Sequence, residues 1–231
     1  CGTGPGIPDR FHNVGIAEAN MIGAPRGMAR SGERPFVHSF AVFATRRAYD
    51  QVAMQIAYPR LPVTIVGFLP GLTTLLGVTH QAIDDVALMR ALPGMAVIEP
   101  ADMPSVRAAV RASAAHPGPV YLRMRRADGP LPGDLAQRPL TLGRADVRRD
   151  GEDAVVFASG MMVGVALAAA ERLAARGRSV AVIDMHTVKP LDTDAVLRWA
   201  RRTGHVVTAE NHSIVGGLGS AVAEALMEAG V

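Results

Sequence analysis

The sequence predicts an α/β protein made of two parallel-sheet domains, each with helices packed against its sheet. Two observations support this prediction. Apolar runs typical of buried strands alternate with helix-like stretches along the chain, as they do in βαβ units. The alternation stops once, in a stretch rich in Pro, Gly and charge at 127–150, and then resumes. We therefore expect a first domain at 1–128, a linker at 129–150 and a smaller second domain at 151–231.

The first domain is expected to begin with a short apolar strand in RFHNVG that leads directly into a helix near Glu18. Pro25 lies inside this helix and should kink or end it, because proline has no amide hydrogen to donate. Asp102 is the expected N-cap of a later helix. The remaining patterns of this domain predict strands at 62–68, 95–99 and 119–124, and helices near 41–58, 81–92 and 103–115.

The second domain repeats the alternation of strands and helices. Its expected strands are DAVVFASG, SVAVIDM and HVVTAE, and its expected helices lie at 163–176, at 192–203 and from about 218. The chain begins without Met and stops where a further strand is expected. We therefore expect both domains to be incomplete at the chain ends.

The composition, with 49% hydrophobic and 19% charged residues, is that of a globular protein. No apolar run reaches the length of a transmembrane helix, and the first residues lack the pattern of a signal peptide, so we expect a cytoplasmic protein. Cys1 is the only cysteine. An intramolecular disulfide and a multi-cysteine metal site are therefore excluded.

The positive charge comes almost entirely from arginine, because Lys189 is the only lysine. The arginines are spread along the chain and aromatic residues make up only 4% of it, which argues against a nucleic-acid surface. One local cluster stands out, formed by Arg123, Arg125 and Arg126. Such a cluster fits a small anionic substrate better than a polynucleotide.

Glu18 is the first candidate for chemistry, because apolar residues surround it and no basic residue lies nearby in the sequence. It is either a first-turn acid that favours the helix dipole or a carboxylate that handles a proton. Phe40 and Phe43 lie three residues apart near a helix start, and core packing alone would explain them. His80 precedes a helix, either as a structural group or as a neutral acid–base group. The segment GGLGS follows no dinucleotide-binding pattern, which favours close packing over an anion site.

Four stretches resemble the transketolase family when they are taken together in this order. They are PDRFHNVGIAEANMIG, FAVFATRRAYDQV, GVTHQAIDDVALMRALPGM and HTVKPLD…AENHSIVGGLGSAVAEAL. The similarity covers nearly the whole chain and includes the pyrimidine-binding and C-terminal domains. The length resembles the C-terminal subunit of a split transketolase, which consists of two different chains. Two alternatives are the β-type subunit of a 2-oxo acid dehydrogenase and a non-catalytic binding module.

The resemblance implies specific roles for the candidate residues. Glu18 would share a proton with N1′ of the aminopyrimidine ring of thiamine diphosphate and so activate the cofactor. Phe40 and Phe43 match aromatic positions that stack on this ring. His80 matches a histidine that contacts substrate oxygens. Arg126 matches an arginine that binds the acceptor phosphate, with Arg123 or Arg125 as alternative counterparts.

The resemblance also implies a partner subunit. The family binds the diphosphate through Mg²⁺ with a G-D-G…N motif, and this motif does not occur here. A diphosphate-binding N-terminal subunit would supply that site, in a heterotetramer whose active site lies between chains, and this chain would contribute no metal ligand. The chain alone should be an inactive half of a ketol transferase.

Two departures from the family pattern concern the substrate. Leu75 and Leu76 stand where many transketolases have Glu-Asp, and Phe68 falls near an upstream family histidine. The pocket is therefore less polar than that of a sugar-phosphate transketolase. We expect a less hydroxylated or otherwise unusual donor or acceptor.

Overall fold

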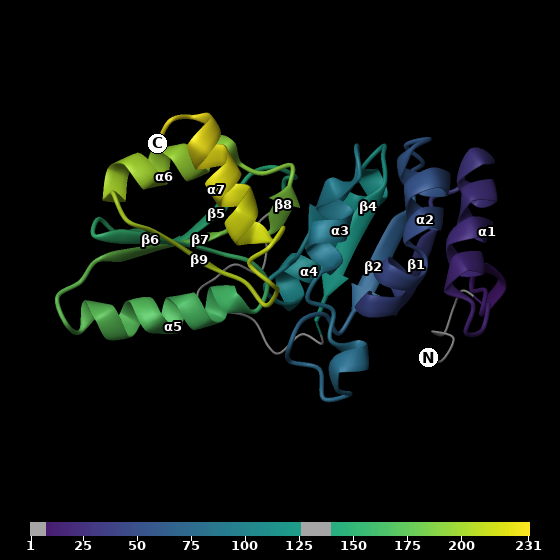
Figure 1. Cartoon of the computed structure of the whole chain (residues 1–231), viewed down its shortest axis with the longest axis horizontal. Coiled ribbons are helices and arrows are strands. Elements are labelled where there is room, and N and C mark those ends of the chain that lie inside the picture. The colour runs from purple at the N-terminus through teal and green to yellow at the C-terminus, as the bar shows by residue number, and fades with distance from the viewer. Residues whose placement is uncertain (1–7, 126–139) are drawn as a thin grey trace.

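Helix α1 (Glu18–Arg30) shows how the sequence shapes the first domain. Its buried residues, Glu18, Ile22, Pro25 and Ala29, recur every three or four positions and form one stripe along the helix. Pro25 therefore lies on the packed face. Of the expected kink or end, the end does not occur, because the helix continues to Arg30. The packing of this stripe stabilises the helix, although Pro25 cannot donate its backbone hydrogen bond. The computed structural model describes residues 8–125 and 140–231 (Figure 1).

The predicted pair of α/β domains is confirmed. The described elements of the first domain are η1 (Pro8–Arg10), α1, β1 (Phe36–Phe40), η2 (Phe43–Arg47), α2 (Tyr49–Gln51), η3 (Val52–Ala57), β2 (Thr64–Phe68), η4 (Val78–His80), α3 (Asp85–Ala91), β3 (Ala96–Ile98), α4 (Met103–Ala115) and β4 (Val120–Met124). Those of the second domain are β5 (Asp146–Arg149), β6 (Ala154–Ala158), α5 (Met162–Ala174), β7 (Val180–Asp184), β8 (Thr187–Lys189), α6 (Thr193–Thr203), β9 (Val206–Ala209) and α7 (Leu218–Glu228).

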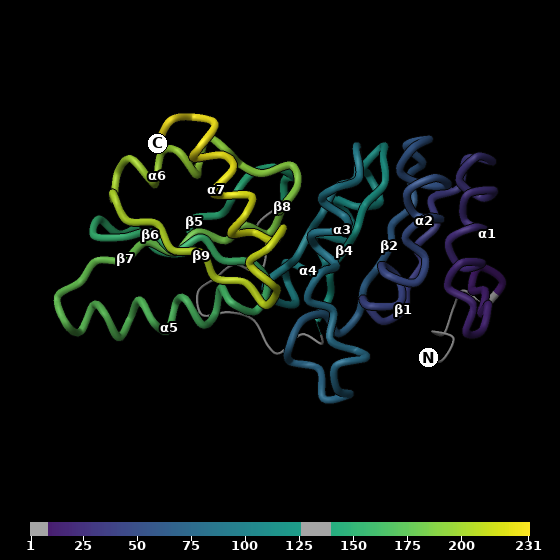
Figure 2. The backbone as a smooth tube through the Cα atoms, viewed as in Figure 1, coloured from purple at the N-terminus to yellow at the C-terminus, as the bar shows by residue number. Residues whose placement is uncertain are grey.

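The two sheets are parallel except at one edge each. The first sheet has the order β1-β2-β4-β3-β8, and its first four strands pair in parallel. The second has the order β5-β7-β6-β9, in which β5 pairs antiparallel with β7. Strand β8 follows β7 in the chain but pairs antiparallel with β3 of the first sheet. Figure 2 shows this return of the backbone toward the first domain.

One apolar core runs through both domains. On one face of the first sheet, Ile65, Val97 and Tyr121 pack with residues of α1, η3 and α3. The same cluster continues through Phe157 and Ile183 into α6 and α7 of the second domain. Helix α4 covers the opposite face of the first sheet, and α5 covers the opposite face of the second. The two domains therefore share buried packing.

Three local expectations differ from the structure. Residues 11–15 form no strand, and the short helix η1 precedes them in the part of the chain that the structure describes. The helix expected at 41–58 is divided into η2, α2 and η3, of which η2 and η3 are wider π-type turns. Strand β5 lies within the stretch expected to be a linker and joins the second sheet. Asp102 does cap α4, because its side chain accepts a hydrogen bond from the Ser105 amide at 2.9 Å.

Candidate functional site

The carboxyl ends of β1 and β2 bring three predicted residues together. Phe40 ends β1, Phe43 begins η2, and His80 lies in η4 on the connection from β2 to α3. The rings of Phe40 and Phe43 lie 5.9 Å apart between centroids, and each lies 5.1 Å from the His80 ring. All three contacts are edge-to-face, a favoured geometry for aromatic pairs. We call these three residues the aromatic site.

Glu18 is connected to the aromatic site through Arg47. The Arg47 guanidinium donates a hydrogen bond from Nη1 to Glu18 Oε2 at 2.9 Å. Its Cζ also lies 4.2 Å from the centroid of the Phe43 ring. Glu18 therefore has a basic partner, although no basic residue lies near it in the sequence. Because Arg47 lies 29 residues away in the sequence, no local pattern could reveal the pair.

Arg46 and Arg47 face different neighbours although they are adjacent. Consecutive helical residues do not share a face. Arg46 donates through Nε to both carboxylate oxygens of Asp84, at 2.7 and 3.0 Å. The hydrogen bond to Asp84 raises the pKa of Arg46 and outweighs the opposing effect of burial. This pair ties the turn that holds Phe43 to the start of α3, four residues after His80.

His80 is half-buried between the two phenylalanines. Its Nδ1 lies 2.9 Å from Thr79 Oγ1, so one ring nitrogen is held by a local hydrogen bond. The ring position is thus fixed both by this contact and by the edges of Phe40 and Phe43. A histidine oriented in this way can hydrogen-bond an oxygen of a small molecule placed against the aromatic rings.

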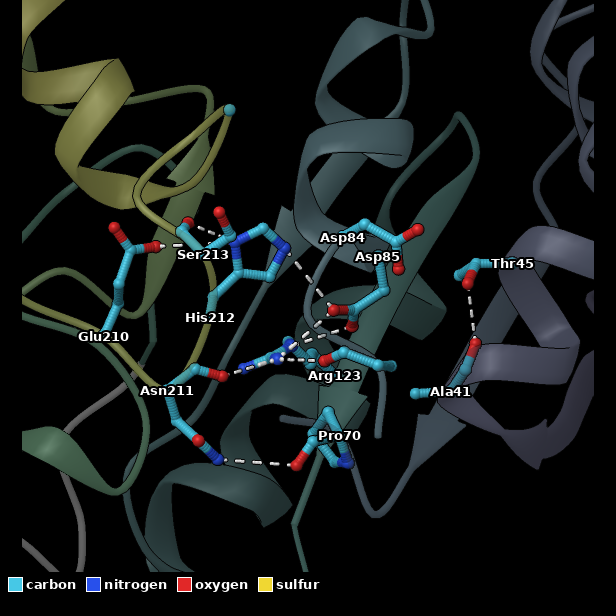
Figure 3. A network of polar contacts seen from close by, with 12 residues as sticks. Ala41, Thr45, Pro70, Asp84, Asp85, Arg123, Glu210, Asn211, His212 and Ser213 are labelled. Carbon is cyan, nitrogen blue, oxygen red and sulfur yellow. Dashed lines mark hydrogen bonds and ion pairs between the residues drawn. The ribbon is translucent and has the colours of Figure 1, made fainter. Parts of the chain in front are cut away.

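The Arg123 side chain lies elsewhere, at the junction between the domains (Figure 3). It is fully buried, and its Nε donates to Asp85 Oδ2 at 2.8 Å. Nη1 donates to Glu99 Oε1, and Nη2 donates to the Asn211 carbonyl at 2.9 Å. Burial disfavours the charged guanidinium, but the carboxylates of Asp85 and Glu99 outweigh it and raise the pKa of Arg123.

The expectation that Arg123 contacts the substrate conflicts with this placement, because the side chain has no exposed surface. Arg125 is partly buried and also has a partner within the chain. Arg126 lies outside the described residues. Sequence reasoning could not distinguish these arginines, because they share one short segment and the sequence does not show which way a side chain points.

The surroundings of the aromatic site are apolar and open. Phe68 packs edge-on against His38 at 5.4 Å between centroids. Five large apolar side chains next to Glu18 or His80 in the sequence are more than half exposed, and we call them the apolar rim: Ile16, Leu72, Leu75, Leu76 and Val78. Leu75 is 99% exposed. The backbone between β2 and α3 forms a loop at the bottom of Figure 2, and at its start the Leu72 amide donates a hydrogen bond to Asn211 Oδ1 of the second domain at 3.0 Å.

At the N-terminus of α7, in GGLGS, a carboxylate of the same chain binds the free backbone amides. The Glu210 carboxylate accepts hydrogen bonds from the amides of Leu218 at 2.7 Å and Gly219 at 2.8 Å. A side chain at Gly217 would meet Glu210 Oε2 at 2.0 Å. This segment is therefore closely packed, and its free amides already have an anionic partner.

The arrangement around Glu18 fits a flat, nitrogen-containing ring. A carboxylate that is only 7% exposed can accept a hydrogen bond from a ring nitrogen, and the phenylalanines offer apolar faces beside it. No group of three or more potential metal-binding side chains occurs in the described part of the chain. None of the helices within 8–125 and 140–231 is long and apolar enough to span a membrane.

Comparison with known proteins identifies the family. The model of the transketolase pyrimidine-binding domain matches residues 4–132, and that of the transketolase C-terminal domain matches residues 143–231. The chain belongs to the transketolase family. The family resemblance read from the sequence is therefore confirmed.

Individual relatives cover most of this transketolase-family chain. It is 50% identical to a 6-deoxy-6-sulfo-D-fructose transketolase subunit of Clostridium sp. (strain MSTE9), over 96% of this chain and 69% of the relative. It is 36% identical to one of the subunits of an apulose-4-phosphate transketolase from Phocaeicola vulgatus, over 96% of this chain and 72% of the relative. A solved split-gene transketolase, in an inactive beta4 tetramer, has a TM-score of 0.89 at 45% identity and covers 96% of this chain and 72% of that one.

Proposed function

We propose that the chain is the C-terminal, pyrimidine-binding subunit of a split transketolase. It would transfer a two-carbon ketol unit from a ketose, or its phosphate, to an aldose, or its phosphate. The observation that carries the proposal is the buried Glu18 carboxylate beside the aromatic site. Family membership implies the use of thiamine diphosphate, which when bound supplies a stabilised carbanion for the ketol unit.

Each residue of the site would have a separate task. Glu18 would hold a proton at N1′ of the aminopyrimidine, a task that burial favours because water cannot compete for the carboxylate. Phe40 and Phe43 would bind the ring and exclude water from it. His80 would donate a hydrogen bond to a substrate oxygen from a ring fixed by Thr79. Arg126 remains a prediction for binding the acceptor phosphate.

A diphosphate-binding subunit would complete the active site and hold the Mg²⁺. Two observations support this partner. The sequence lacks the G-D-G…N motif, and the apolar rim leaves several large side chains exposed beside Glu18 and His80. Relatives that are themselves transketolase subunits support a heteromeric arrangement. We propose a heterotetramer in which the apolar rim contacts the partner, and we place it in the cytoplasm.

The substrate would be a less hydroxylated or otherwise unusual sugar. Leu76 is 53% exposed and offers no carboxylate to a sugar hydroxyl. The named substrates of the two relatives, a 6-deoxy-6-sulfo sugar and apulose 4-phosphate, are both unusual sugars. A donor screen with the assembled enzyme should favour sugars of these kinds. Full activity with ordinary pentose phosphates would contradict this part of the proposal.

The decisive experiment measures ketol transfer by the full chain co-expressed with a candidate diphosphate-binding subunit, with thiamine diphosphate and Mg²⁺. Glu18→Gln keeps the size of the side chain but removes its capacity to share a proton, so we expect a loss of kcat of about 100-fold or more. Glu171→Gln, an exposed change on α5, is the matched control and should leave the rate unchanged.

The alternatives predict different results in the same assay. If the pair assembles and binds the cofactor but shows no dependence on Glu18, the protein is a non-catalytic binding module. If the pair instead decarboxylates 2-oxo acids and does not transfer ketol units, it is the β-type subunit of a 2-oxo acid dehydrogenase. Assembly is checked by size-exclusion chromatography before either conclusion.

A further inference from the structure

A single side chain, Arg47, makes both of the contacts that the proposed function assigns to the aminopyrimidine ring. Its guanidinium binds the Glu18 carboxylate at 2.9 Å and lies 4.2 Å from the centroid of Phe43. A guanidinium is planar, delocalised and rich in donors, so it can pair with a carboxylate and stack on an aromatic face at once. A protonated aminopyrimidine shares these properties. Arg47 therefore occupies the surfaces on which the ring would bind.

Arg47 also explains how Glu18 is tolerated in a chain without cofactor. The Glu18 side chain is only 8% exposed, and a buried carboxylate without a partner is costly. The Arg47 side chain, in contrast, is 49% exposed. Its guanidinium is therefore already partly hydrated, and it can move fully into water. The pair can therefore be exchanged only for a ligand that itself hydrogen-bonds the buried Glu18 carboxylate.

We propose that Arg47 is an internal competitor of the cofactor. In the chain without cofactor its guanidinium occupies Glu18 and Phe43, and binding of the aminopyrimidine displaces it into solvent. This inference rests on the proposed function of Glu18 and Phe43. It differs from a supporting role, in which Arg47 would hold Glu18 in place while the ring is bound. The two roles predict opposite changes in affinity when Arg47 is removed.

The test measures the binding of thiamine, which carries the aminopyrimidine but no diphosphate, to the full chain alone by titration calorimetry. Arg47→Ala should tighten the dissociation constant about three- to tenfold, because the competing ion pair and cation–π contact are gone. Arg47→Lys keeps the charge but loses the planar stacking, so it should tighten binding less. Arg178→Ala, an exposed change in the second domain, is the matched control and should not alter binding.

A second variant locates the effect. Adding Glu18→Gln to Arg47→Ala should abolish the gain in affinity, because the carboxylate is the shared partner. Circular dichroism and thermal unfolding establish that each variant is folded, and Arg47→Lys provides the comparison if Arg47→Ala does not fold.

Three results would overturn the inference. They are unchanged affinity in Arg47→Ala, weakened affinity, which would indicate a supporting role, and no detectable binding to any variant at millimolar thiamine. None of them depends on the assembled enzyme. The assay of Glu18→Gln with the partner subunit tests the proposed function separately, so the two failures are distinguishable.

Discussion

Two of the arginine–carboxylate clusters in the described chain differ in how far water reaches them. At the domain junction, Arg123 and Asp85 are both fully buried. Beside the aromatic site, Arg47 is half exposed while its partner Glu18 is buried. The same chemistry therefore serves two purposes. The enclosed pair holds the domains in one arrangement, whereas the open pair can be exchanged for a ligand.

The junction is reinforced from several elements. Ser159 donates a hydrogen bond to Glu99 Oε2 at 2.8 Å, and Tyr121 donates to Asp85 Oδ2 at 2.6 Å. Asn211 and His212 approach from the second domain, and His212 Nε2 lies 3.6 Å from Asp85 Oδ1 (Figure 3). The His80 segment leads directly into this cluster through α3. A rigid junction therefore supports one side of the candidate site.

The largest expected effect is the removal of the buried guanidinium. Arg123→Met should lower the free energy of unfolding by roughly 3–5 kcal/mol, because Asp85 and Glu99 would remain buried without a partner. Arg46→Met is the matched change in an exposed pair beside the aromatic site. The side chains of Arg46 and its partner Asp84 are both about 40% exposed, so the loss should be less than about 1 kcal/mol. Urea unfolding measures both. Equal losses would show that burial does not distinguish the buried arginine from the exposed one.

A smaller effect is expected where the backbone of the first domain meets Asn211. Gly71 has a φ of +76°, and an added Cβ would lie 2.2 Å from Asn211 Nδ2 and 2.4 Å from its carbonyl oxygen. Gly71→Ala should therefore cost about 2–4 kcal/mol, from the strained φ and from the clash. Gly204→Ala, at a φ of +67° with open space around it, should cost only about 1 kcal/mol. Thermal unfolding that ranks Gly204→Ala as the costlier change would contradict a tightly packed junction.

The smallest expected effect is a pH dependence. His186 is 2% exposed, and burial lowers its pKa below 6.5, outweighing the nearby carboxylates of Asp146 and Asp192. The unfolded chain therefore binds the extra proton first as the pH falls. The contribution of His186 to stability is complete above pH 6.5 and is lost below it, by up to about 1.4 kcal/mol per pH unit.

Urea unfolding at several pH values between 7 and 5 measures this contribution. His186→Gln should flatten the decline in stability, because glutamine does not titrate. His205→Gln, an exposed change, should leave the decline as it is in the wild type. A wild-type curve with the same slope as that of His186→Gln would show that burial does not lower the pKa of His186.

Much of the fold could be predicted from the sequence because its signals are local. The alternation of apolar runs located β2, β3, β4 and most helices, and Asp102 marked the start of α4. The errors arose where packing overrides a local preference, as at Pro25, or where a short strand such as β5 gains its stability from a distant partner. A short strand with few apolar residues has no signature of its own.

The sequence names candidate residues for the site, whose roles stay predictions, but not the contacts between them. The family motifs identified Glu18, Phe40, Phe43 and His80, and the structure brings the last three together. The ion pair between Arg47 and Glu18 and the burial of Arg123 depend on which way side chains point after folding. Residue type and spacing do not determine these side-chain orientations, so they become visible only in the three-dimensional structure.

The position of strand β8 in the sequence affects how the chain folds during translation. Its pairing partner, β3, is synthesised about 90 residues earlier. At translation speeds of about 5–20 residues per second, the edge of β3 waits roughly 5–20 s on the ribosome for the strand that covers it. An uncovered edge is a template for pairing with other chains. We therefore expect the first domain, expressed without residues 187–189, to aggregate, and the nascent chain to depend on chaperones until β8 has emerged.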